Sequence, residues 1–457
     1  MCIPLVCQKM AQPHSWLCYL LRRDGAQTES GRNAQHAPLA SLACDSSRDV
    51  YNSPVMNRRE ILQVLAATLA STALPRNTFA LPQTTSPNPQ VPSSASSKPL
   101  VNLLEYEEAA QNRLSKMAFD YVAEGAGDEI TLHRNRECLS AIRLNPSVLI
   151  DVSRLDTQVD LFGQKLDFPI LLAPAAFHKL MNPEGEIATA RGAAMAGATL
   201  VVSTVATTSI EDIGKSAQGP LWFQLYVQRD RGFTRELVRR AEAAGCRALC
   251  ITVDSPVPGT RNRELRDEFQ LPPGMILENL KNMKSAVTRQ TNGPGNDQQK
   301  IFSLLMDPKL TWEGIDSIRS YAKVPVMLKG ILNPDDARRA VEHDADGIIV
   351  SNHGGRQLDT VPATIEALPR VIEAVEGRIP ILMDGGIRRG TDVIKALALG
   401  ARAVLIGRPY LWALAVNGAA GVDQVIRILR SEFLTTMALC GTPSISSITR
   451  NVIWRDR

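Results

Sequence analysis

The stretch PILMDGGIRRGTDVIKALALGARAVLIG, residues 380–407, holds two apolar runs separated by a helical pattern. PILMDGG (380–386) and ARAVLIG (401–407) predict buried strands, because both runs are short and apolar and carry turn-forming glycines. GTDVIKALALG (390–400) predicts the helix between them, with Thr391 as its capping residue. A strand, a helix and a second strand in this order indicate two parallel strands joined by a crossover helix.

The same unit recurs along the body of the chain. Two further helices are predicted over 234–245 and 333–344, and Ser209 and Asn333 are expected to cap helices. Six more candidate strands precede residue 380: PILLAPA (169–175), ATLVVST (198–204), PLWFQLY (220–226), ALCITVD (248–254), VPVMLKG (324–330) and DGIIVSN (346–352). Eight such units predict an α/β fold, a closed (β/α)8 TIM barrel rather than an open doubly wound sheet.

Two segments depart from the repeated unit. The first is an N-terminal helical extension, residues 100–165, with the pattern LLEYEEAAQNRLSKMAFDYVAEGAG. We expect it to pack against the bottom or side of the barrel and to bring Tyr121 to the site. The second is a long insertion after strand 4, between Ser255 and Lys323, which includes the polar run TRQTNGPGNDQQK. Insertions of this kind in a barrel are often lids over the site.

Residues 1–100 divide into three segments. Residues 1–55 show no sustained period and are predicted to be an unstructured extension, not made at all if Met56 is the biological start. Residues 56–82 place Arg58 and Arg59 before a short apolar segment. This pattern is similar to a twin-arginine export signal and predicts the periplasm or cell envelope; the alternative is an amphipathic helix on the tail of a cytoplasmic protein. Residues 83–100 form a Pro/Ser-rich linker, predicted to be disordered, and 101–457 form the barrel.

Composition and charge exclude several classes of protein. Across 457 residues, 51 Lys and Arg nearly balance 47 Asp and Glu, so the net charge of +4 gives no electrostatic reason to expect a nucleic acid. No apolar run reaches about 18 residues, which argues against a permanent membrane span. The eight cysteines match no zinc or iron–sulfur spacing, so we expect no metal site, and buried free thiols in the barrel.

The expected carboxyl ends of the strands carry polar residues, and chemistry gathers at this end of such barrels. Each residue alone has a structural explanation, such as a rim charge or a turn. Six consecutive strands that end in groups suited to catalysis or anion binding together predict an active site. The residues are Gln224, Tyr226, Thr252, Asp254, Lys329, Ser351, His353, Asp384 and Gly407, followed in the loops by Arg261, Arg356, Arg388 and Arg408.

The loops also indicate the ligands. The glycines of DGGIRRG and IGRP would let backbone N–H groups approach an anion, and Arg388 or Arg408 would add charge-assisted hydrogen bonds. Because no GxGxxG fingerprint follows a first strand, we expect a mononucleotide such as FMN. In SNHGGRQLD, His353 would act as a general base, and the planar guanidinium of Arg356 would bind a carboxylate. Arg261 could supply a second guanidinium for the same carboxylate. These features predict a small acid oxidised on a flavin.

SNHGGRQLD (351–359) resembles the signature of the FMN-dependent (S)-2-hydroxy-acid oxidases and dehydrogenases, the group of glycolate oxidase, lactate oxidase and flavocytochrome-type lactate dehydrogenase. The likeness covers residues 101 to about 450. The other matching motifs, in family order, are FDYVAEGAGDE, LAPAAFHKL, PEGEIATARGAAMAG, FQLYV, TVDSPVPGTRNRE, LKGI, DGGIRRGTDVIKALALGA and IGRP. The resemblance implies oxidation of a small (S)-2-hydroxy acid to the 2-oxo acid, FMN as cofactor, and a homo-oligomer, expected to be a tetramer.

The resemblance also implies a role for each matching residue. His353 takes a proton from the substrate, Asp254 steadies the resulting imidazolium, and Tyr226 hydrogen-bonds the substrate oxygen. Lys329 lies near the flavin N1/C2 carbonyl and favours the negative charge of reduced flavin. The substrate carboxylate is held by Tyr121, Arg261 and Arg356. The flavin ring and ribityl chain are lined by Pro174, Ala175, Ala176, Ser203, Gln224, Thr252, Lys329 and Ser351. The ribityl end and phosphate are bound by Asp384, Gly385, Gly386, Arg388, Gly407 and Arg408.

Three positions depart from the plant-type glycolate oxidases. Val205 stands where those enzymes carry a tryptophan, and the smaller side chain should enlarge the pocket. Ala175 replaces a threonine near the flavin, and Val122 follows Tyr121 where an aromatic residue is usual. These changes favour lactate or a somewhat longer 2-hydroxy acid as substrate.

The electron acceptor is open between two alternatives. Oxygen is favoured because the 255–323 insertion lacks an obvious membrane-binding apolar segment, whereas the predicted export signal favours a quinone or cytochrome. A hypothesis of another class is an FMN barrel isomerase or a non-catalytic flavin-binding protein. The joint presence of His353, Arg356 and Arg261 argues against both.

Overall fold

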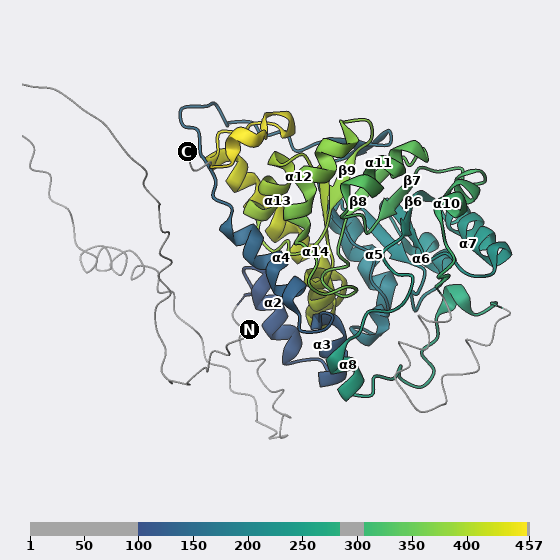
Figure 1. The fold of residues 1–457 in the computed structure, drawn as a ribbon. Coiled ribbons are helices and arrows are strands. Elements are labelled where there is room, and N and C mark those ends of the chain that lie inside the picture. Colours follow the sequence, from purple (N-terminus) through teal and green to yellow (C-terminus); the bar gives the residue numbers. More distant parts are fainter. Residues whose placement is uncertain (1–98, 284–305, 455–457) are drawn as a thin grey trace, which may run out of the picture. The chain divides into compact units, whose positions relative to one another are not determined.

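The computed structural model describes residues 99–283 and 306–454 of the chain. Within these ranges, parallel strands close into a barrel in the order β10, β3, β4, β5, β6, β7, β8, β9 (Figure 1). The prediction of a (β/α)8 barrel is therefore confirmed. The strands are β3 (Ile170–Leu172), β4 (Leu200–Ser203), β5 (Leu221–Leu225), β6 (Cys246–Thr252), β7 (Val326–Lys329), β8 (Gly347–Val350), β9 (Ile381–Met383) and β10 (Ala403–Ile406).

The strands read as continuous apolar runs because both of their faces are buried. Leu171 and Val201 pack inside the barrel, whereas their neighbours Leu172 and Val202 pack in the layer between the barrel and the helices. The outer layer consists of α5 (Gly185–Ala196), α6 (Ile210–Ser216), α7 (Arg231–Ala243), α10 (Trp312–Arg319), α11 (Pro334–Glu342), α12 (Thr364–Val375), α13 (Gly390–Ala398) and α14 (Arg408–Leu439).

Two of the three predicted helix caps are confirmed. The side chains of Ser209 and Asn333 each accept a hydrogen bond from a backbone N–H in the first turn of α6 and α11. The prediction for Thr391 is wrong, because α13 already begins at Gly390. The carboxylate of Asp392 instead accepts the N–H groups of the two residues before the helix, at 2.9 and 3.0 Å.

The N-terminal extension forms α2 (Leu103–Gln111), α3 (Lys116–Ala123) and α4 (Ile130–Ala141). The single helical pattern predicted over 103–127 is broken between α2 and α3, because Ser115 caps a new helix by accepting the N–H of Ala118 at 3.2 Å. Helix α3 lies beside α8 (Asn262–Arg266), which follows β6 (Figure 1). Helix α3 therefore reaches the carboxyl end of the barrel and brings Tyr121 to the cavity there, as predicted. Helices α2 and α4 pack on the side of the barrel, α2 against α14 and α4 against α12 and α13.

The amino end of the barrel is closed by a hairpin of β1 (Val159–Leu161) and β2 (Gln164–Leu166). Its apolar side chains join the cluster inside the barrel, which contains the fully buried Trp222. The Trp222 indole N–H donates to Gln164 Oε1 at 3.1 Å. Truncating a tryptophan in such a place costs about 3–5 kcal/mol. The part of the extension that packs against the bottom of the barrel is thus this hairpin.

The insertion after the fourth barrel strand lies between β6 and β7. Its described parts contain α8, the short η2 (Glu278–Leu280) and α10. The polar run TRQTNGPGNDQQK lies outside the described residues, as do the predicted extension 1–55, the export signal 56–82 and residues 83–98 of the linker. The remaining short helices are η1 (His178–Leu180), η4 (Ile445–Ser447) and η5 (Arg450–Val452).

The described ranges 99–283 and 306–454 also bear on membranes, metals and thiols. No helix in these ranges is both long and apolar enough to cross a membrane. The same ranges contain no group of His, Cys, Asp and Glu side chains arranged to hold a metal ion. Cys246, Cys250 and Cys440 are buried free thiols, as predicted, and Cys138 is a free thiol that is partly exposed.

Candidate active site

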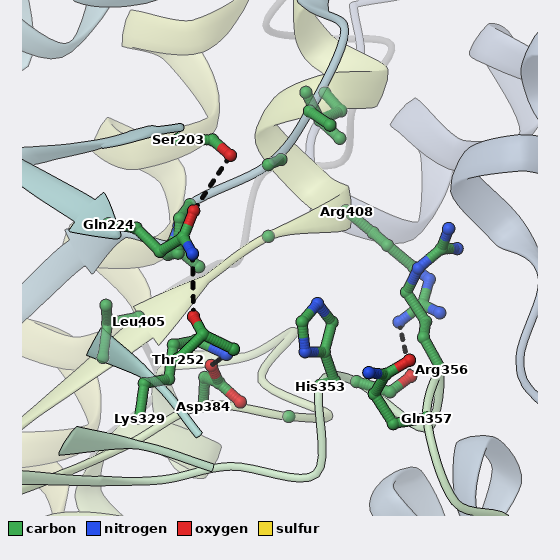
Figure 2. Close-up of a pocket in the computed structure, with 18 of the residues that line it drawn as sticks. Ser203, Gln224, Thr252, Lys329, His353, Arg356, Gln357, Asp384, Leu405 and Arg408 are labelled. Carbon is green, nitrogen blue, oxygen red and sulfur yellow. Dashed lines mark hydrogen bonds and ion pairs between the residues drawn. The ribbon is translucent and has the colours of Figure 1, made fainter. Parts of the chain in front are cut away.

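A cavity of about 1090 Å³, including space open to solvent, lies at the carboxyl end of the barrel. All the site residues predicted from the sequence line it except Asp254 and Ser351. These two lie behind the lining, where Asp254 contacts His353 and Ser351 contacts Lys329. Figure 2 shows His353 between two groups of lining residues: Ser203, Gln224 and Thr252 on one side, and Arg356, Gln357 and Arg408 on the other.

His353 is placed by a tight left-handed turn directly after β8. His353, Gly354 and Gly355 all have positive φ angles, of 58°, 66° and 76°. Such a conformation is costly for a residue with a Cβ and tends to occur at functional positions. The His353 ring directs Nδ1 at Asp254, at 3.1 Å from Oδ1 and 3.3 Å from Oδ2. With Nδ1 donating to the carboxylate, Nε2 is the ring nitrogen that can accept a proton.

The charges of this pair are set by burial and by each other. Burial lowers the pKa of His353, and the nearby carboxylate of Asp254 opposes that effect without cancelling it. Burial would raise the pKa of Asp254, but the His353 and Lys329 charges and hydrogen bonds from His353 and Ser255 outweigh it and lower that pKa overall. Near neutral pH the pair is therefore a neutral imidazole hydrogen-bonded to a carboxylate, which is the form a general base requires.

Gly330, at the end of β7, makes room for Asp254. Its φ of +113° is one that residues with side chains rarely adopt. A Cβ at this position would lie 2.5 Å from Asp254 Cβ and 2.8 Å from its Oδ2. The close approach of the two strand ends therefore requires glycine here.

Lys329 is a buried cation held between two oxygen atoms. Its Nζ donates to Ser351 Oγ at 2.8 Å and pairs with Asp384 Oδ2 at 3.1 Å. Burial would lower the pKa of Lys329, but the charges of Asp384 and Asp254 outweigh burial and raise it. The other oxygen of Asp384, Oδ1, is buried and has no hydrogen-bond partner among the described residues. Because Asp384 lines the cavity, this unsatisfied acceptor suits a ligand hydroxyl.

A row of polar side chains crosses three neighbouring strands at the cavity floor. Ser203 on β4 donates to Gln224 Oε1 at 3.0 Å, and Gln224 Nε2 on β5 donates to Thr252 Oγ1 on β6 at 2.9 Å (Figure 2). The backbone N–H of Thr204 also donates to Gln224 Oε1 at 3.3 Å, and because an N–H can only donate, it fixes which end of the Gln224 amide faces each neighbour. The row thus presents a fixed pattern of donors and acceptors to a planar polar ligand.

Two arginines form a cationic cluster with a buried glutamate. Arg356 donates from Nη1 to the carbonyl of Tyr121 at 2.7 Å, and its guanidinium lies over the Tyr121 ring, 5.1 Å from the centroid. Glu264 Oε1 lies 3.0 Å from Arg261 Nε and 3.3 Å from Arg356 Nη2. Burial raises the pKa of Tyr121 to about 12 and that of Tyr226 further. Both phenols are therefore neutral hydrogen-bond donors.

Two glutamates of this region were not predicted from the sequence. Glu264 follows Arg261 by three residues, a spacing that places both on one side of α8 and could have indicated the pair. Glu124 follows α3, and its carboxylate accepts the backbone N–H groups of Arg263 and Glu264 at the start of α8. That contact joins residues about 140 positions apart. No local sequence pattern signals it.

Arg388 is buried, Arg408 is half-buried, and both guanidiniums line the same cavity. The three nitrogens of the Arg408 guanidinium donate to the carbonyls of Val122, Gly354 and Glu124, at 2.8 to 2.9 Å. Burial, followed by the charges of Arg356 and Arg388, lowers the pKa of Arg408 to about 9. Burial likewise lowers the pKa of Arg388 to about 10. A dianionic phosphate beside them would relieve this destabilisation.

These features fit a bound flavin mononucleotide. The guanidiniums of Arg388 and Arg408 suit its phosphate, and the unpartnered Asp384 oxygen suits a ribityl hydroxyl. The Ser203–Gln224–Thr252 row suits the polar edge of the ring. Lys329 supplies a positive charge between the row and Asp384.

The chain matches the family described as FMN-dependent dehydrogenase over residues 110–455. This match covers more than half of the chain, so the protein belongs to that family, and FMN is its cofactor. The protein is therefore an FMN-dependent enzyme of the 2-hydroxy-acid oxidase group.

Individual relatives agree with this assignment. The chain is 50% identical to the L-lactate oxidase of Nostoc sp., over 76% of this chain and 96% of the relative. It is 45% identical to the glycolate oxidase of Spinacia oleracea, over 78% of this chain and 96% of the relative. Among solved structures, mandelate oxidase with (S)-4-hydroxymandelic acid is similar with a TM-score of 0.74 and 40% identity, over 78% of this chain and 98% of that chain.

Proposed function

We propose that the protein oxidises a small (S)-2-hydroxy monocarboxylic acid, lactate or a somewhat longer acid, to the 2-oxo acid, with oxygen as the electron acceptor. The observation that carries this proposal is the His353–Asp254 pair, which lies on the same cavity as the Arg261–Arg356–Glu264 cluster. One feature provides a base, and the other provides an anchor for a carboxylate.

The charge of the anchor fits a monocarboxylate. Counted over Arg261, Arg356 and Glu264, two guanidinium charges and one carboxylate leave one net positive charge. The neutral phenols of Tyr121 and Tyr226 on the same cavity can donate hydrogen bonds without adding charge. A single substrate carboxylate is thus neutralised, whereas a second one would be left buried without a counter-charge.

The residues divide the work of the oxidation as follows. Converting the alcohol to the ketone removes two protons and two electrons, and FMN, when bound, would supply the acceptor for both electrons and for the proton that His353 does not take. His353 Nε2 accepts one proton from the substrate, and Asp254 stabilises the imidazolium that results. Tyr226 donates to the substrate oxygen, and the arginine cluster holds the carboxylate so that the reacting carbon stays in place. Lys329 favours negative charge that develops beside it.

The size of the substrate is limited by apolar residues of the same cavity, including Val122, Val205 and Met306. Val205 is almost completely buried, so a larger side chain there must project into the cavity or displace its neighbours. We predict that Val205→Trp lowers kcat/KM for lactate and 2-hydroxybutyrate by about tenfold or more relative to glycolate. Steady-state rates with the three acids test this, and an unchanged ranking would show that Val205 does not limit the substrate.

Oxygen as acceptor is supported by the relatives, which are named as oxidases. A quinone or cytochrome remains the alternative acceptor. The decisive experiment bleaches the flavin anaerobically with a panel of (S)-2-hydroxy acids and then admits air. We expect bleaching by lactate, followed by reoxidation with one hydrogen peroxide formed per pyruvate. Bleached flavin that persists in air but recovers with a quinone would favour the dehydrogenase, and flavin that no acid bleaches would contradict the proposed function.

A further inference from the structure

Two side chains, Ser255 and Gln357, form a chain of hydrogen bonds that ends at the Asp254 carboxylate. Ser255, which is buried, donates from Oγ to Asp254 Oδ1 at 2.8 Å. The side-chain amide of Gln357 donates to Ser255 Oγ and, at 3.3 Å, to the Asp254 carbonyl. The Gln357 Oε1 atom accepts the backbone N–H of Gly259 at 3.0 Å.

The direction of each hydrogen bond in this chain is fixed. Because the N–H of Gly259 can only donate, it meets the oxygen of the Gln357 amide and leaves the NH₂ group facing Ser255. The hydroxyl of Ser255 then accepts from that NH₂ group, so its own proton is directed at Asp254. Asp254 in turn accepts from His353 Nδ1. The chain therefore leaves His353 with Nε2 as its proton acceptor.

The same chain joins the two loops that carry the site. Gln357 lies on the loop after β8, which carries His353 and Arg356, whereas Ser255 and Gly259 lie on the loop after β6 that leads to Arg261. The two loops are in backbone contact at Gly259, where a Cβ would lie 2.4 Å from the Arg356 carbonyl. Arg261 also donates to that carbonyl from Nη1 at 2.9 Å. The position of the base and the position of the carboxylate anchor are thus connected.

We propose that Ser255 and Gln357 are positioning residues. They hold the Asp254 carboxylate, and through it the His353 ring, at a fixed position relative to the arginine cluster. This inference rests on the proposed function, because it assigns a purpose to residues that contact Asp254, the partner of the base, and not the base itself. It concerns the step in which His353 takes a proton. It does not concern FMN binding or reoxidation, because neither step needs the base.

The test is anaerobic stopped-flow reduction of the FMN-loaded full chain by L-lactate. Ser255→Ala removes the donor to Asp254, and we expect the limiting rate of flavin reduction to fall about tenfold to a hundredfold. The apparent Kd for lactate, the FMN content and the rate of reoxidation by oxygen should stay within about twofold of wild type. Ser255→Thr keeps the hydroxyl and should restore most of the rate.

Two further variants separate positioning from general structural damage. Gln357→Glu has the same shape but replaces the NH₂ donor by an acceptor, which draws the Ser255 proton away from Asp254, so we expect a similar loss of rate. Ser209→Ala is the matched control, because Ser209 is a buried serine that donates to the Asp212 carboxylate, also at 2.8 Å, at the start of α6. It should reduce flavin at the wild-type rate.

The outcomes are distinguishable. A wild-type rate in Ser255→Ala, while lactate still bleaches the wild-type flavin, would overturn this inference and leave the proposed function intact. If Ser255→Ala loses rate together with equal losses in lactate affinity, FMN content and reoxidation, that result would also overturn the inference. A loss of rate that Ser255→Thr does not restore would overturn it as well. Absence of bleaching in the wild-type protein would instead reject the proposed function itself.

Discussion

His353 combines a strained backbone, a carboxylate partner and a partly buried environment in one residue. The φ of 58° directs the ring toward the cavity, and Asp254 fixes its orientation from behind. Burial keeps the ring neutral where a solvent-exposed histidine would be partly charged. At the scale of the residue, the site is therefore prepared to take up a proton.

The lowered pKa of His353 predicts how flavin reduction depends on pH. An ordinary histidine titrates near about 6.5, and burial lowers this value in His353. The base works only when neutral, so the limiting rate should be constant above that range and fall as the pH drops through the lowered pKa. Stopped-flow reduction between pH 5 and 8 measures this. In His353→Gln the acidic limb should vanish, and the rate should be at least about a hundredfold lower with FMN still bound.

Gly330 offers a second prediction at this scale. Gly330→Ala would place a methyl group within 2.5 Å of the Asp254 side chain, at a φ of +113°. We expect the displaced carboxylate to lose its hydrogen bond to His353, and the rate of flavin reduction to fall at least about a hundredfold. The matched control is Gly163→Ala, since the hairpin turn at Gly163 also has positive φ but leaves the Cβ in open space. A wild-type rate in Gly330→Ala would show that the close approach is not required.

At the scale of elements, the site depends on how α3 and α8 are joined. The Glu124 carboxylate accepts two N–H groups at the start of α8, directly after Arg261. Its own backbone carbonyl also accepts from Arg356 and Arg408. One short segment thus fixes both the anchor for the substrate and the neighbouring cationic side chain of Arg408.

The contact between Glu124 and α8 gives a third prediction. Glu124→Gln keeps the size of the side chain but leaves only one oxygen for the two N–H groups of α8. Losing such a cap costs about 1 kcal/mol, so we expect the Kd for lactate to rise several-fold while FMN content is unchanged. Lactate titrations of the reduction rate measure this. An unchanged Kd would mean that Arg261 keeps its position without the contact between Glu124 and α8.

The sequence predicts elements better than it predicts contacts between them. The strands and most helices follow from local apolar periodicity, and the residues at the strand ends follow from the topology of the barrel. The missed residues, such as Glu124, Ser255 and Gln357, act through partners that are distant in sequence or through side-chain orientation. The Thr391 cap was wrong for a related reason, because Asp392 two residues from the helix start made the competing contact.

At the scale of the whole molecule, the barrel holds two guanidinium charges that an anionic ligand would stabilise. The burial of Arg388 and the partial burial of Arg408 lower the pKa values of both groups, so their cationic forms are destabilised in the protein without FMN. Any anion that binds there stabilises the folded state by mass action. The cofactor is therefore expected to contribute to stability as well as to catalysis.

This leads to a prediction for the protein from which FMN has been removed. Its Tm should be lower than that of the FMN-bound protein by several degrees, and inorganic phosphate should restore part of the difference. Riboflavin, which lacks the phosphate, should restore less than FMN. Differential scanning calorimetry checks all three. An apoprotein that unfolds at the same temperature with and without phosphate would indicate that the two arginines are stable without an anion.

The hairpin of β1 and β2 has a consequence for the traffic of small molecules. Together with the side chains around Trp222 it fills the amino end of the cylinder, so nothing can pass through from that side. The cavity lies at the opposite end, so among the described residues the hydroxy acid reaches His353 and the oxo acid leaves through the loops after the strands. The end of the cylinder that carries no chemistry is thus free to serve as a solid foundation for the end that does.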